Sequence, residues 1–326
     1  MEDNGSSKVL DLYIRANENK NKIVLTDKNG DKYSEAEMVV LSCMAMVVRE
    51  QEDEDKNIDY DKVIKTIILN SLDGKLDGLK KQEEYQKYID ACKSLDDEEA
   101  FGASTVYERM VNGFGAYLDP VYTEELFVNR NLKLHDKKRK GHIYWGVKTD
   151  RIENILEHIY GCLVLSIGLE SEYGYLVDYN KIRKMLTIHE TGEIIIGDIT
   201  EWDMPKKEKE KIERQAVVKL LNSIPNGERL IKLLDEFNGH ISLESEYAYL
   251  IDKIEYDMQV KMYEKEGKYD FDNVPQNVVT TSDSVQEIIK NGAEGVFDVH
   301  YEYDKEKYNR IPCFRRILEK TKSYWF

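Results

Sequence analysis

The sequence predicts a mostly α-helical fold, and three observations support this prediction. Apolar residues recur at three- and four-residue spacing through most of the chain. The 326 residues include only five prolines and nineteen glycines, which disfavours a strand-and-turn architecture. Apolar residues make up 41% and charged residues 34% of the chain, which is typical of a real core beneath a well-solvated helical surface.

Helices are expected where the amphipathic spacing is sustained. In chain order these segments are 36–50, 60–71, 80–94, 151–169, 178–191, 206–222, 227–237, 243–264 and 304–321. The best candidates for strands are residues 22–27 and 295–303. Residues 266–284 are expected to form a loop, and residues 97–104 a connection between two helices.

The charge balance limits the classes of ligand. The net charge of −16 argues against general nucleic-acid binding, because neutralising a phosphate backbone requires a basic face. The only concentrated basic run is HDKKRK, residues 135–140. A small phosphate ligand in a locally basic pocket remains compatible with this composition.

Cysteine usage and hydropathy indicate a cytoplasmic protein. The four cysteines include no pair at CxxC spacing, so they are expected to be free thiols rather than zinc ligands or disulfides. The first ten residues are acidic and polar, unlike a signal peptide. The longest apolar run, at 38–48, is too short to cross a membrane, so no membrane association is expected.

Two segments of the chain resemble each other. Residues 57–71 align with residues 176–190 through a shared Asp-Tyr pair and two lysines. The preceding segments, 35–48 and 155–168, match in outline with one gap. One interpretation is a duplicated helical unit, and the other is a chance resemblance between lysine-rich amphipathic helices. The histidines of the second segment pair have no counterpart in the first.

Three segments of the second half carry residues that suit a metal ion. His158 lies on the apolar face of a predicted helix. His189 and Glu190 end the next helix, and Asp252 follows a later apolar run. Two imidazoles and two carboxylates suit a divalent cation such as Mn²⁺, Co²⁺, Fe²⁺ or Mg²⁺. The alternative is structural, with hydrogen-bonded core histidines and an aspartate that caps a helix or pairs with a lysine.

The spacing within TIHETGEIIIGDIT, residues 187–200, supports the metal interpretation. On a continuous helix His189 and Glu193 would be four residues apart and would share a face. Glu190 would lie about 100° away and could face the edge of the same cavity. Gly197 allows a left-handed turn, after which Asp198 can face back toward the site.

In their order these segments resemble the HD-domain phosphohydrolases, and most closely the 5'-deoxynucleotidase branch. That branch has Arg-x-Gly-Trp, Glu-His, His-Asp-x-x-Glu, Gly-Asp-Ile and a late Leu-Asp-Lys. The corresponding stretches here are RKGH at 139–142, EH at 157–158, HETGE at 189–193, GDI at 197–199 and IDK at 251–253. The resemblance covers roughly 120 residues, and it implies an HD-domain helical bundle.

The resemblance also implies a role for each matching residue. Glu193 would be the acid/base group that positions or deprotonates the attacking water. Arg139 would hold the phosphate, and Asp198 would contact a sugar hydroxyl. A divalent ion, which could be Mn, Co, Fe, Mg or Zn, would be held by His158, His189, Glu190 and Asp252.

Two residues depart from the pattern of the branch. Glu190 replaces an aspartate, so this carboxylate ligand is longer by one methylene. A rigid metal site tolerates such a change poorly. His142 stands where the branch has tryptophan, at a position that would lie near the substrate. Glu190 therefore bears on catalysis, and His142 bears on base or sugar preference.

The implied function is metal-dependent hydrolysis of a nucleotide, most simply a nucleoside 5'-monophosphate. The alternative is a catalytically weakened or inactive protein that binds a nucleotide or a protein partner. Residues 131–326 would form the HD-domain phosphohydrolase-like part with a C-terminal extension. Residues 1–130 would form a helical domain, which could be a degenerate copy. The resemblance to this branch also implies a possible homodimer. Alternatively, residues 1–130 could take the place of the second subunit, which would make the chain an intramolecular pseudodimer.

Overall fold

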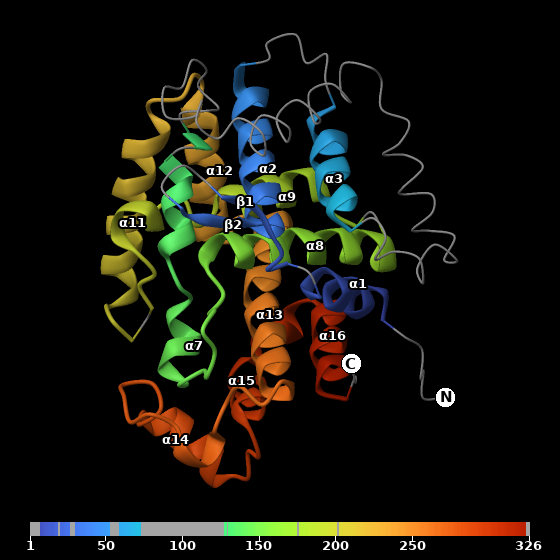
Figure 1. The fold of residues 1–326 in the computed structure, drawn as a ribbon. Helices are drawn as coiled ribbons and strands as arrows, with labels where there is room; N and C mark the ends of the chain where they lie inside the picture. Colours follow the sequence, from blue (N-terminus) through green and yellow to red (C-terminus); the bar gives the residue numbers. More distant parts are fainter. Residues whose placement is uncertain are drawn as a thin grey trace.

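A computed structural model shows a predominantly helical protein (Figure 1). The structure describes residues 7–18, 20–26, 30–52, 59–72, 127–128, 130–174, 176–200 and 202–323. Among these residues, the sheet structure is one antiparallel pair of short strands. No helix in these ranges is both long enough and apolar enough to cross a bilayer.

The N-terminal segments pack directly on the helices that follow them. Helix α1 (Lys8–Asn17) leads into the hairpin of β1 (Ile23–Thr26) and β2 (Lys32–Ser34), in which Ile23 pairs with Ser34. Helix α2 (Glu35–Glu52) follows β2 without a break, and α3 (Tyr60–Ser71) completes this part. Their apolar side chains join those of the second half in one buried cluster.

Three helices form the centre of the fold. Helix α8 (Ile155–Tyr173) begins with a capping box, in which Asn154 and Glu157 satisfy each other's backbone N–H groups. Helix α9 (Tyr179–Ile188) packs on α8, and the long helix α13 (Leu243–Lys265) crosses both (Figure 1). Residues 155–170 of α8 are all buried, because α1, α2, α9 and α13 surround this helix.

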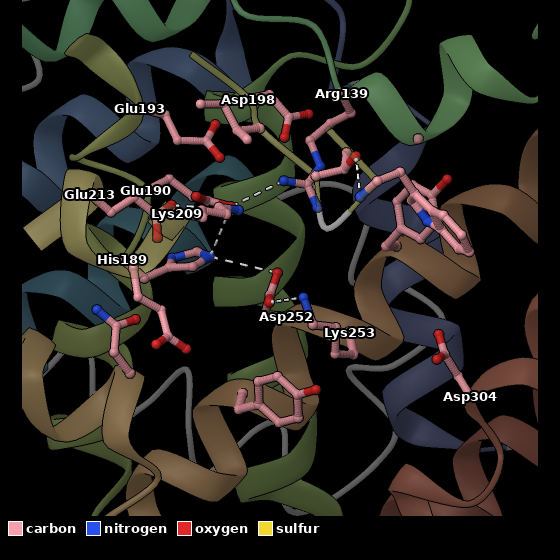
Figure 2. Close-up of a pocket in the computed structure, with 18 of the residues that line it drawn as sticks. Arg139, His189, Glu190, Glu193, Asp198, Lys209, Glu213, Asp252, Lys253 and Asp304 are labelled. Carbon is pink, nitrogen blue, oxygen red and sulfur yellow. Dashed lines mark hydrogen bonds and ion pairs between the residues drawn. The ribbon is translucent and has the colours of Figure 1, made fainter. Parts of the chain in front are cut away.

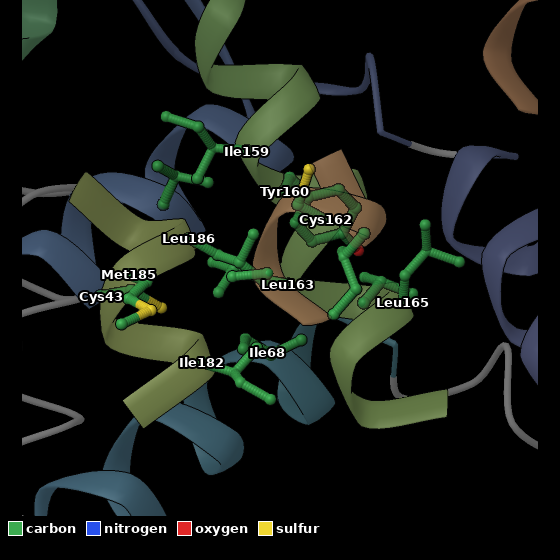
Figure 3. Packing of buried hydrophobic residues seen from close by; sticks show 14 of the residues in the cluster. Cys43, Ile68, Ile159, Tyr160, Cys162, Leu163, Leu165, Ile182, Met185 and Leu186 are labelled. Carbon is green, nitrogen blue, oxygen red and sulfur yellow. The ribbon is translucent and has the colours of Figure 1, made fainter. Parts of the chain in front are cut away.

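The core between these helices is aliphatic and tightly filled. Figure 3 shows Cys43 of α2 and Ile68 of α3 facing Leu163 of α8 and Leu186 of α9. All four side chains are fully buried. Burial of this area from both halves of the chain stabilises the arrangement of the central helices. The three described cysteines, Cys43, Cys162 and Cys313, are free and buried, as expected; Cys92 lies outside the described residues.

The remaining elements surround the central helices and cover the ends of α13. They are η2 (Leu132–Asp136), α7 (Lys140–Tyr144), α10 (Glu193–Ile196), α11 (Lys206–Leu221), α12 (Gly227–Gly239), η3 (Phe271–Asn273), α14 (Asp283–Lys290), α15 (Val296–Asp304), η4 (Lys307–Arg310) and α16 (Pro312–Ser323). Helices α11 and α12 pack on each other, while α15 packs on α13 (Figure 1).

Most of the predicted elements are confirmed. The helix predicted at 60–71 and the strand predicted near 22–27 occur there. Residues 266–282 are irregular apart from the short turn η3, and the predicted loop ends at α14, which begins at Asp283. Helices α1 and α14 were not predicted. The helix predicted at 80–94 and the connection at 97–104 lie outside the described residues.

The strand prediction at 295–303 is wrong, because these residues form helix α15. Val296, Phe297 and Val299 are buried, and this spacing suits one face of a helix packed against α13. The helix predicted at 304–321 is also divided. Helix α15 ends at Asp304, and α16 begins at Pro312, where a proline suits the first turn of a new helix.

The two similar segments have the same local cap. Asp59 Oδ1 accepts a hydrogen bond from the backbone N–H of Lys62, and Asp178 Oδ1 accepts one from Lys181, both at 3.1 Å. Each aspartate therefore stabilises the start of the helix that follows it. Because such caps are common, this likeness is local, and duplication of the whole unit stays a prediction.

Candidate metal centre

Four side chains from three parts of the chain meet beside a cavity, and three of them, His189, Glu190 and Asp252, line it. His158 lies in the first turn of α8, His189 and Glu190 follow the end of α9, and Asp252 lies in α13. Each offers a ligand atom, and these atoms all lie within 4.8 Å of one another. Figure 2 shows the contacts of His189 with Glu190 and Asp252.

The distances within this cluster suit four ligands facing one point. Nε2 of His158 lies 3.0 Å from Oδ1 of Asp252 and 3.9 Å from Oε1 of Glu190. Nε2 of His189 lies 3.8 Å and 3.6 Å from the same two oxygens. Both imidazoles therefore present Nε2 to both carboxylates.

Hydrogen bonds on the far side of each ring set the tautomers. Nδ1 of His189 donates to the carbonyl oxygen of Leu186 at 2.7 Å, so its Nε2 has a free lone pair when the ring is neutral. That Nε2 is buried and has no hydrogen-bond partner among the described residues. An orphaned buried imidazole nitrogen beside two carboxylates fits a metal ion.

Glu255 orients the second imidazole. Its Oε2 lies 2.5 Å from Nδ1 of His158, so the proton on Nδ1 is held there and Nε2 faces the cluster. Gly161 lets α13 approach α8 at this point, because a Cβ at that position would collide with the carboxylate of Glu255. The arrangement is a carboxylate–histidine pair of the kind that supports metal ligands.

The cluster holds strong opposite charges. Burial opposes ionisation of Asp252, yet Lys253 and the two imidazoles lower the pKa of Asp252 well below its usual range. Burial likewise opposes ionisation of Glu190, but His189 and Arg139 lower its pKa to about 2. Both carboxylates are therefore charged at neutral pH. With two imidazoles and two carboxylates, these residues fit a divalent metal ion.

The helical backbone is interrupted between His189 and Glu193. The prediction that these two residues lie on one continuous helix is therefore wrong. Helix α9 ends at Ile188, and Glu193 begins the one-turn helix α10. Gly192 packs against α11 at this turn, where an added Cβ would lie 3.4 Å from a carbonyl oxygen of Glu213. His189 and Glu193 nevertheless line the same cavity.

Glu193 and Asp198 lie at the same side of the cavity in Figure 2. Burial raises the pKa of Glu193 well above its usual range, and the charges of Glu190 and Asp198 raise it further. Its Oε2 is buried and has no partner among the described residues. Gly197 has the expected positive φ of 76°, and Oδ2 of Asp198 accepts a hydrogen bond from the backbone N–H of Lys140 at 2.7 Å.

Arg139 faces the same space from the start of α7. Its Nη1 lies 3.0 Å from Oε1 of Glu190, and its guanidinium lies over the ring of Tyr256. Although burial disfavours the charged form, Asp198 and Glu190 raise the pKa of Arg139 well above its usual range. A buried, permanently charged guanidinium beside a candidate metal centre suits an anionic ligand.

The cavity has a volume of about 390 Å³, enough for a small ligand. Its wall combines aromatic side chains with most of the residues described above. It also includes ionisable residues that the sequence analysis did not predict as site residues, namely Lys209, Glu213, Lys253, His300, Asp304 and Lys307. Because they come from α11, α13 and the segment around α15, tertiary packing alone brings them together.

His142 does not line this cavity in the structure, and its expected contact with substrate stays a prediction. Its side chain is fully buried behind the wall, where Nδ1 lies 2.9 Å from the hydroxyl of Tyr269. Nε2 lies 3.6 Å from Glu153, and the ring stacks on Tyr256. Trp145, three residues later, lines the cavity instead. The short helix α7 turns position 142 inward and position 145 toward the cavity.

Glu255 is the supporting residue that sequence reasoning missed but could have found. It follows Asp252 by three residues on α13, so the two side chains share a face of the helix. No comparable signal marks Tyr13, whose hydroxyl donates to Oε1 of Glu255 at 2.7 Å from a helix 242 residues away in sequence. Lys148 is exposed and pairs with Asp270 at the surface.

Comparison with known proteins agrees with these features. The HD domain family matches residues 132–293. The chain is 30% identical over 142 residues to 5'-deoxynucleotidase HDDC2 of Dictyostelium discoideum, covering 41% of this chain and 74% of that protein. It is 32% identical over 150 residues to 5'-deoxynucleotidase YGK1 of Saccharomyces cerevisiae, covering 44% and 66%. It is 26% identical over 129 residues to human 5'-deoxynucleotidase HDDC2, covering 39% and 61%.

Proposed function

Because this chain belongs to the HD-domain family and is a metal-dependent phosphoric ester hydrolase of its 5'-deoxynucleotidase branch, we propose that its substrate is a nucleoside 5'-monophosphate. The observation that carries this proposal is a cluster of two imidazoles and two carboxylates that lies next to Arg139 and reaches the cavity through His189, Glu190 and Asp252. A phosphomonoester carries two negative charges near neutral pH, and the proposal places it between the Arg139 guanidinium and the candidate metal ligands.

The metal ligands in this proposal are His158, His189, Glu190 and Asp252. When bound, a divalent metal there acidifies water and stabilises the charge that develops on the phosphoryl oxygens. The mixed nitrogen and oxygen donors favour Mn²⁺, Fe²⁺, Co²⁺ or Zn²⁺ over Mg²⁺, because imidazole is a poor ligand for magnesium.

Arg139 binds the phosphate in the proposed mechanism. A guanidinium can hold two phosphate oxygens in parallel, which fixes the orientation of the phosphorus toward the metal centre. Arg139 contacts Glu190, so a phosphate bound at the guanidinium would replace or share this partner. The stacking of Tyr256 near the guanidinium limits where it can move.

Glu193 manages the proton of the attacking water in this mechanism. Its buried carboxyl has a raised pKa, as expected of a group that both accepts and returns a proton near neutral pH. Asp198 binds a sugar hydroxyl, because a carboxylate accepts hydrogen bonds from hydroxyl donors. The aromatic residues that line the rest of the cavity, such as Tyr249 and Trp202, suit a nucleobase.

A second candidate function is nucleotide binding without turnover. The Glu190–Arg139 contact favours it, because one glutamate would have to serve the metal and the phosphate-binding arginine together. The longer side chain makes this dual contact possible. If hydrolysis is lost, metal and nucleotide binding should both remain measurable.

The test is phosphate release from a panel of ribo- and deoxyribonucleoside 5'-monophosphates with Mn²⁺, Co²⁺, Zn²⁺ or Mg²⁺. His189→Ala should abolish release, whereas His135→Gln, a histidine substitution outside the cavity, should retain it. Equal release by the wild type and His189→Ala would refute the assigned site. Nucleotide binding without any release by the wild type would support the second candidate.

A further inference from the structure

A second group of possible metal ligands lies at another part of the cavity. It consists of Asp257 on α13 and of His300 and Asp304 on α15, and one ligand atom from each lies within 4.8 Å of the others. His300 and Asp304 are four residues apart, so they share the face of α15 that packs on α13. This group shares no residue with the first cluster.

Two atoms of this group are buried and have no hydrogen-bond partner among the described residues. They are Oδ1 of Asp257 and Nε2 of His300. The side chain of Asp257 is completely buried, and Oδ1 lies 4.0 Å from Nδ1 of His300, too far for a hydrogen bond. An unpaired buried carboxylate oxygen is costly, and a bound cation would compensate it.

Neighbouring residues orient these ligands. The hydroxyl of Tyr308 donates to Oδ2 of Asp257 at 2.6 Å, which directs the other oxygen toward His300. The imidazole of His300 is held edge-on between the rings of Trp145 and Tyr256, at centroid distances of 5.5 Å and 5.2 Å. Supporting contacts of this kind are typical of built metal sites rather than of accidental acidic clusters.

The charges around the group allow a further cation. Lys307 contacts Oδ1 of Asp304 at 2.5 Å, which is one of the two oxygens of that carboxylate. The other nearby ammonium, Lys253, pairs with Asp252 of the first cluster at 2.9 Å. Among the described residues, no lysine or arginine therefore lies within ion-pair distance of Asp257.

We propose that Asp257, His300 and Asp304 form a separate site for a divalent transition-metal ion such as Zn²⁺ or Co²⁺. One imidazole and two carboxylates suit this class of cation. Both ligands on α15 lie beyond residues 132–293, which match the HD domain family, so the site joins the C-terminal extension to α13. Figure 2 shows Asp304 apart from His189 and Glu190, beyond Lys253.

Bound metal at this site has a structural consequence. It ties α15 to α13 and fixes the wall of the cavity that His300 and Asp304 contribute. The inference does not depend on the proposed hydrolysis, because it concerns metal binding alone. The competing explanation is that Asp257 and Asp304 share a buried proton and no metal binds.

The test uses the full chain in a His189→Ala background, which disables the first cluster. The protein is stripped with a chelator, dialysed against Co²⁺ and analysed for bound metal per chain. Adding His300→Ala should remove one equivalent of Co²⁺ relative to His189→Ala alone, and the Co²⁺-induced rise in thermal midpoint should shrink. Asp257→Asn, which preserves the side-chain shape, should weaken Co²⁺ binding at least about tenfold.

His240→Ala is the matched control, because His240 also lines the cavity but belongs to neither group. It should leave the bound Co²⁺ unchanged. Circular dichroism checks that each variant is folded, and Asp257→Asn decides the question if His300→Ala does not fold. The proposal would be overturned if His189→Ala and the double variant His189→Ala, Asp257→Asn bound the same amount of Co²⁺ and showed the same Co²⁺-induced rise in thermal midpoint. Absence of bound metal in His189→Ala itself would also overturn it.

Discussion

Glu190 lies between the candidate metal cluster and Arg139, the proposed phosphate-binding residue. One of its oxygens lies 3.6 Å from Nε2 of His189 and 3.0 Å from Nη1 of Arg139. The extra methylene relative to aspartate allows this reach from a turn that begins just after α9. The site is therefore built around a glutamate, and its geometry does not require an aspartate at this position.

Replacing Glu190 by aspartate tests this conclusion. The carboxylate would withdraw by about 1.5 Å, one carbon–carbon bond, and would lose contact with the cluster and with Arg139. We expect Glu190→Asp to weaken Co²⁺ or Mn²⁺ affinity about tenfold, measured by titration calorimetry. A rise in turnover with unchanged metal affinity would instead mean that the longer side chain limits catalysis.

Glu193 is expected to contribute to catalysis and not to the stability of the fold. Glu193→Gln preserves the shape of the side chain but cannot exchange a proton, so kcat should fall about 10²- to 10³-fold. Because the pKa of Glu193 is raised, the wild-type rate should decline on the acid side at a pH above the ordinary glutamate range. Steady-state rates across pH measure both effects. Loss of this acid limb in Glu193→Gln agrees with the assigned role, and an unchanged kcat contradicts it.

At the scale of elements, helix α1 reaches the metal cluster through two hydrogen bonds. The hydroxyl of Tyr13 donates to Glu255 at 2.7 Å, and Glu255 holds Nδ1 of His158 at 2.5 Å. Lys20, just after α1, lies 2.6 Å from Glu153 and 2.5 Å from Gln259 in the same buried network. A segment outside the HD-matched residues thus positions the support of a candidate ligand.

Tyr13→Phe tests this contact. Removing the hydroxyl leaves Glu255 freer to rotate, so metal affinity should fall about threefold to tenfold. This effect should be smaller than that of removing Glu255, which contacts the candidate ligand His158 directly. Tyr160→Phe is the matched control, because its buried hydroxyl lies 3.0 Å from Ser71 and not at the cluster. Both variants should lose similar stability in denaturant unfolding. Equal metal affinities in the two variants would contradict a positioning role for Tyr13.

A second contact joins the two halves of the chain and depends on pH. Nδ1 of His135, in η2, lies 2.6 Å from Oε1 of Glu37, in α2. The hydrogen bond to Glu37 raises the pKa of His135, and despite burial the same contact lowers the pKa of Glu37. The charged pair therefore exists above the ordinary glutamate pKa and disappears as pH rises through the folded pKa of His135.

His135→Gln retains a hydrogen-bond donor but carries no charge. The wild type should be more stable than this variant by about 1 to 2 kcal/mol near pH 6, and this difference should shrink as pH rises toward 9. Urea unfolding at several pH values measures it. A difference that does not change with pH would show that the contribution of His135 is packing rather than charge.

At the scale of the whole molecule, the metal cluster joins α8, α9 and α13, the helices at the centre of the fold. A ligand that binds only the folded state stabilises it by about 2.7 kcal/mol when its concentration is 100 times Kd. Chelation should therefore lower the thermal midpoint, by about 4 °C for a chain of 326 residues. In His189→Ala the thermal midpoint should fall less on chelation than in the wild type. An equal fall in the two proteins would mean that the stabilising metal binds outside this cluster.

The fold class was predictable from sequence because helical periodicity is a local property. The predictions for α3, α8, α11, α12 and α13 follow from apolar spacing alone. Segment 295–303 shows the limit of this reasoning. Its aromatic and β-branched residues suit a strand, but packing against α13 favours one helical face.

The sequence by itself determined the order of the motif residues, and its resemblance to the HD-domain phosphohydrolases implied the convergence of His158, His189, Glu190 and Asp252. Only the tertiary structure decided that His142 turns inward, that Glu190 contacts Arg139, and that Asp257 meets α15. The physical reason is that spacing along a helix specifies which side chains share a face. Which buried group meets which partner depends on how distant segments pack.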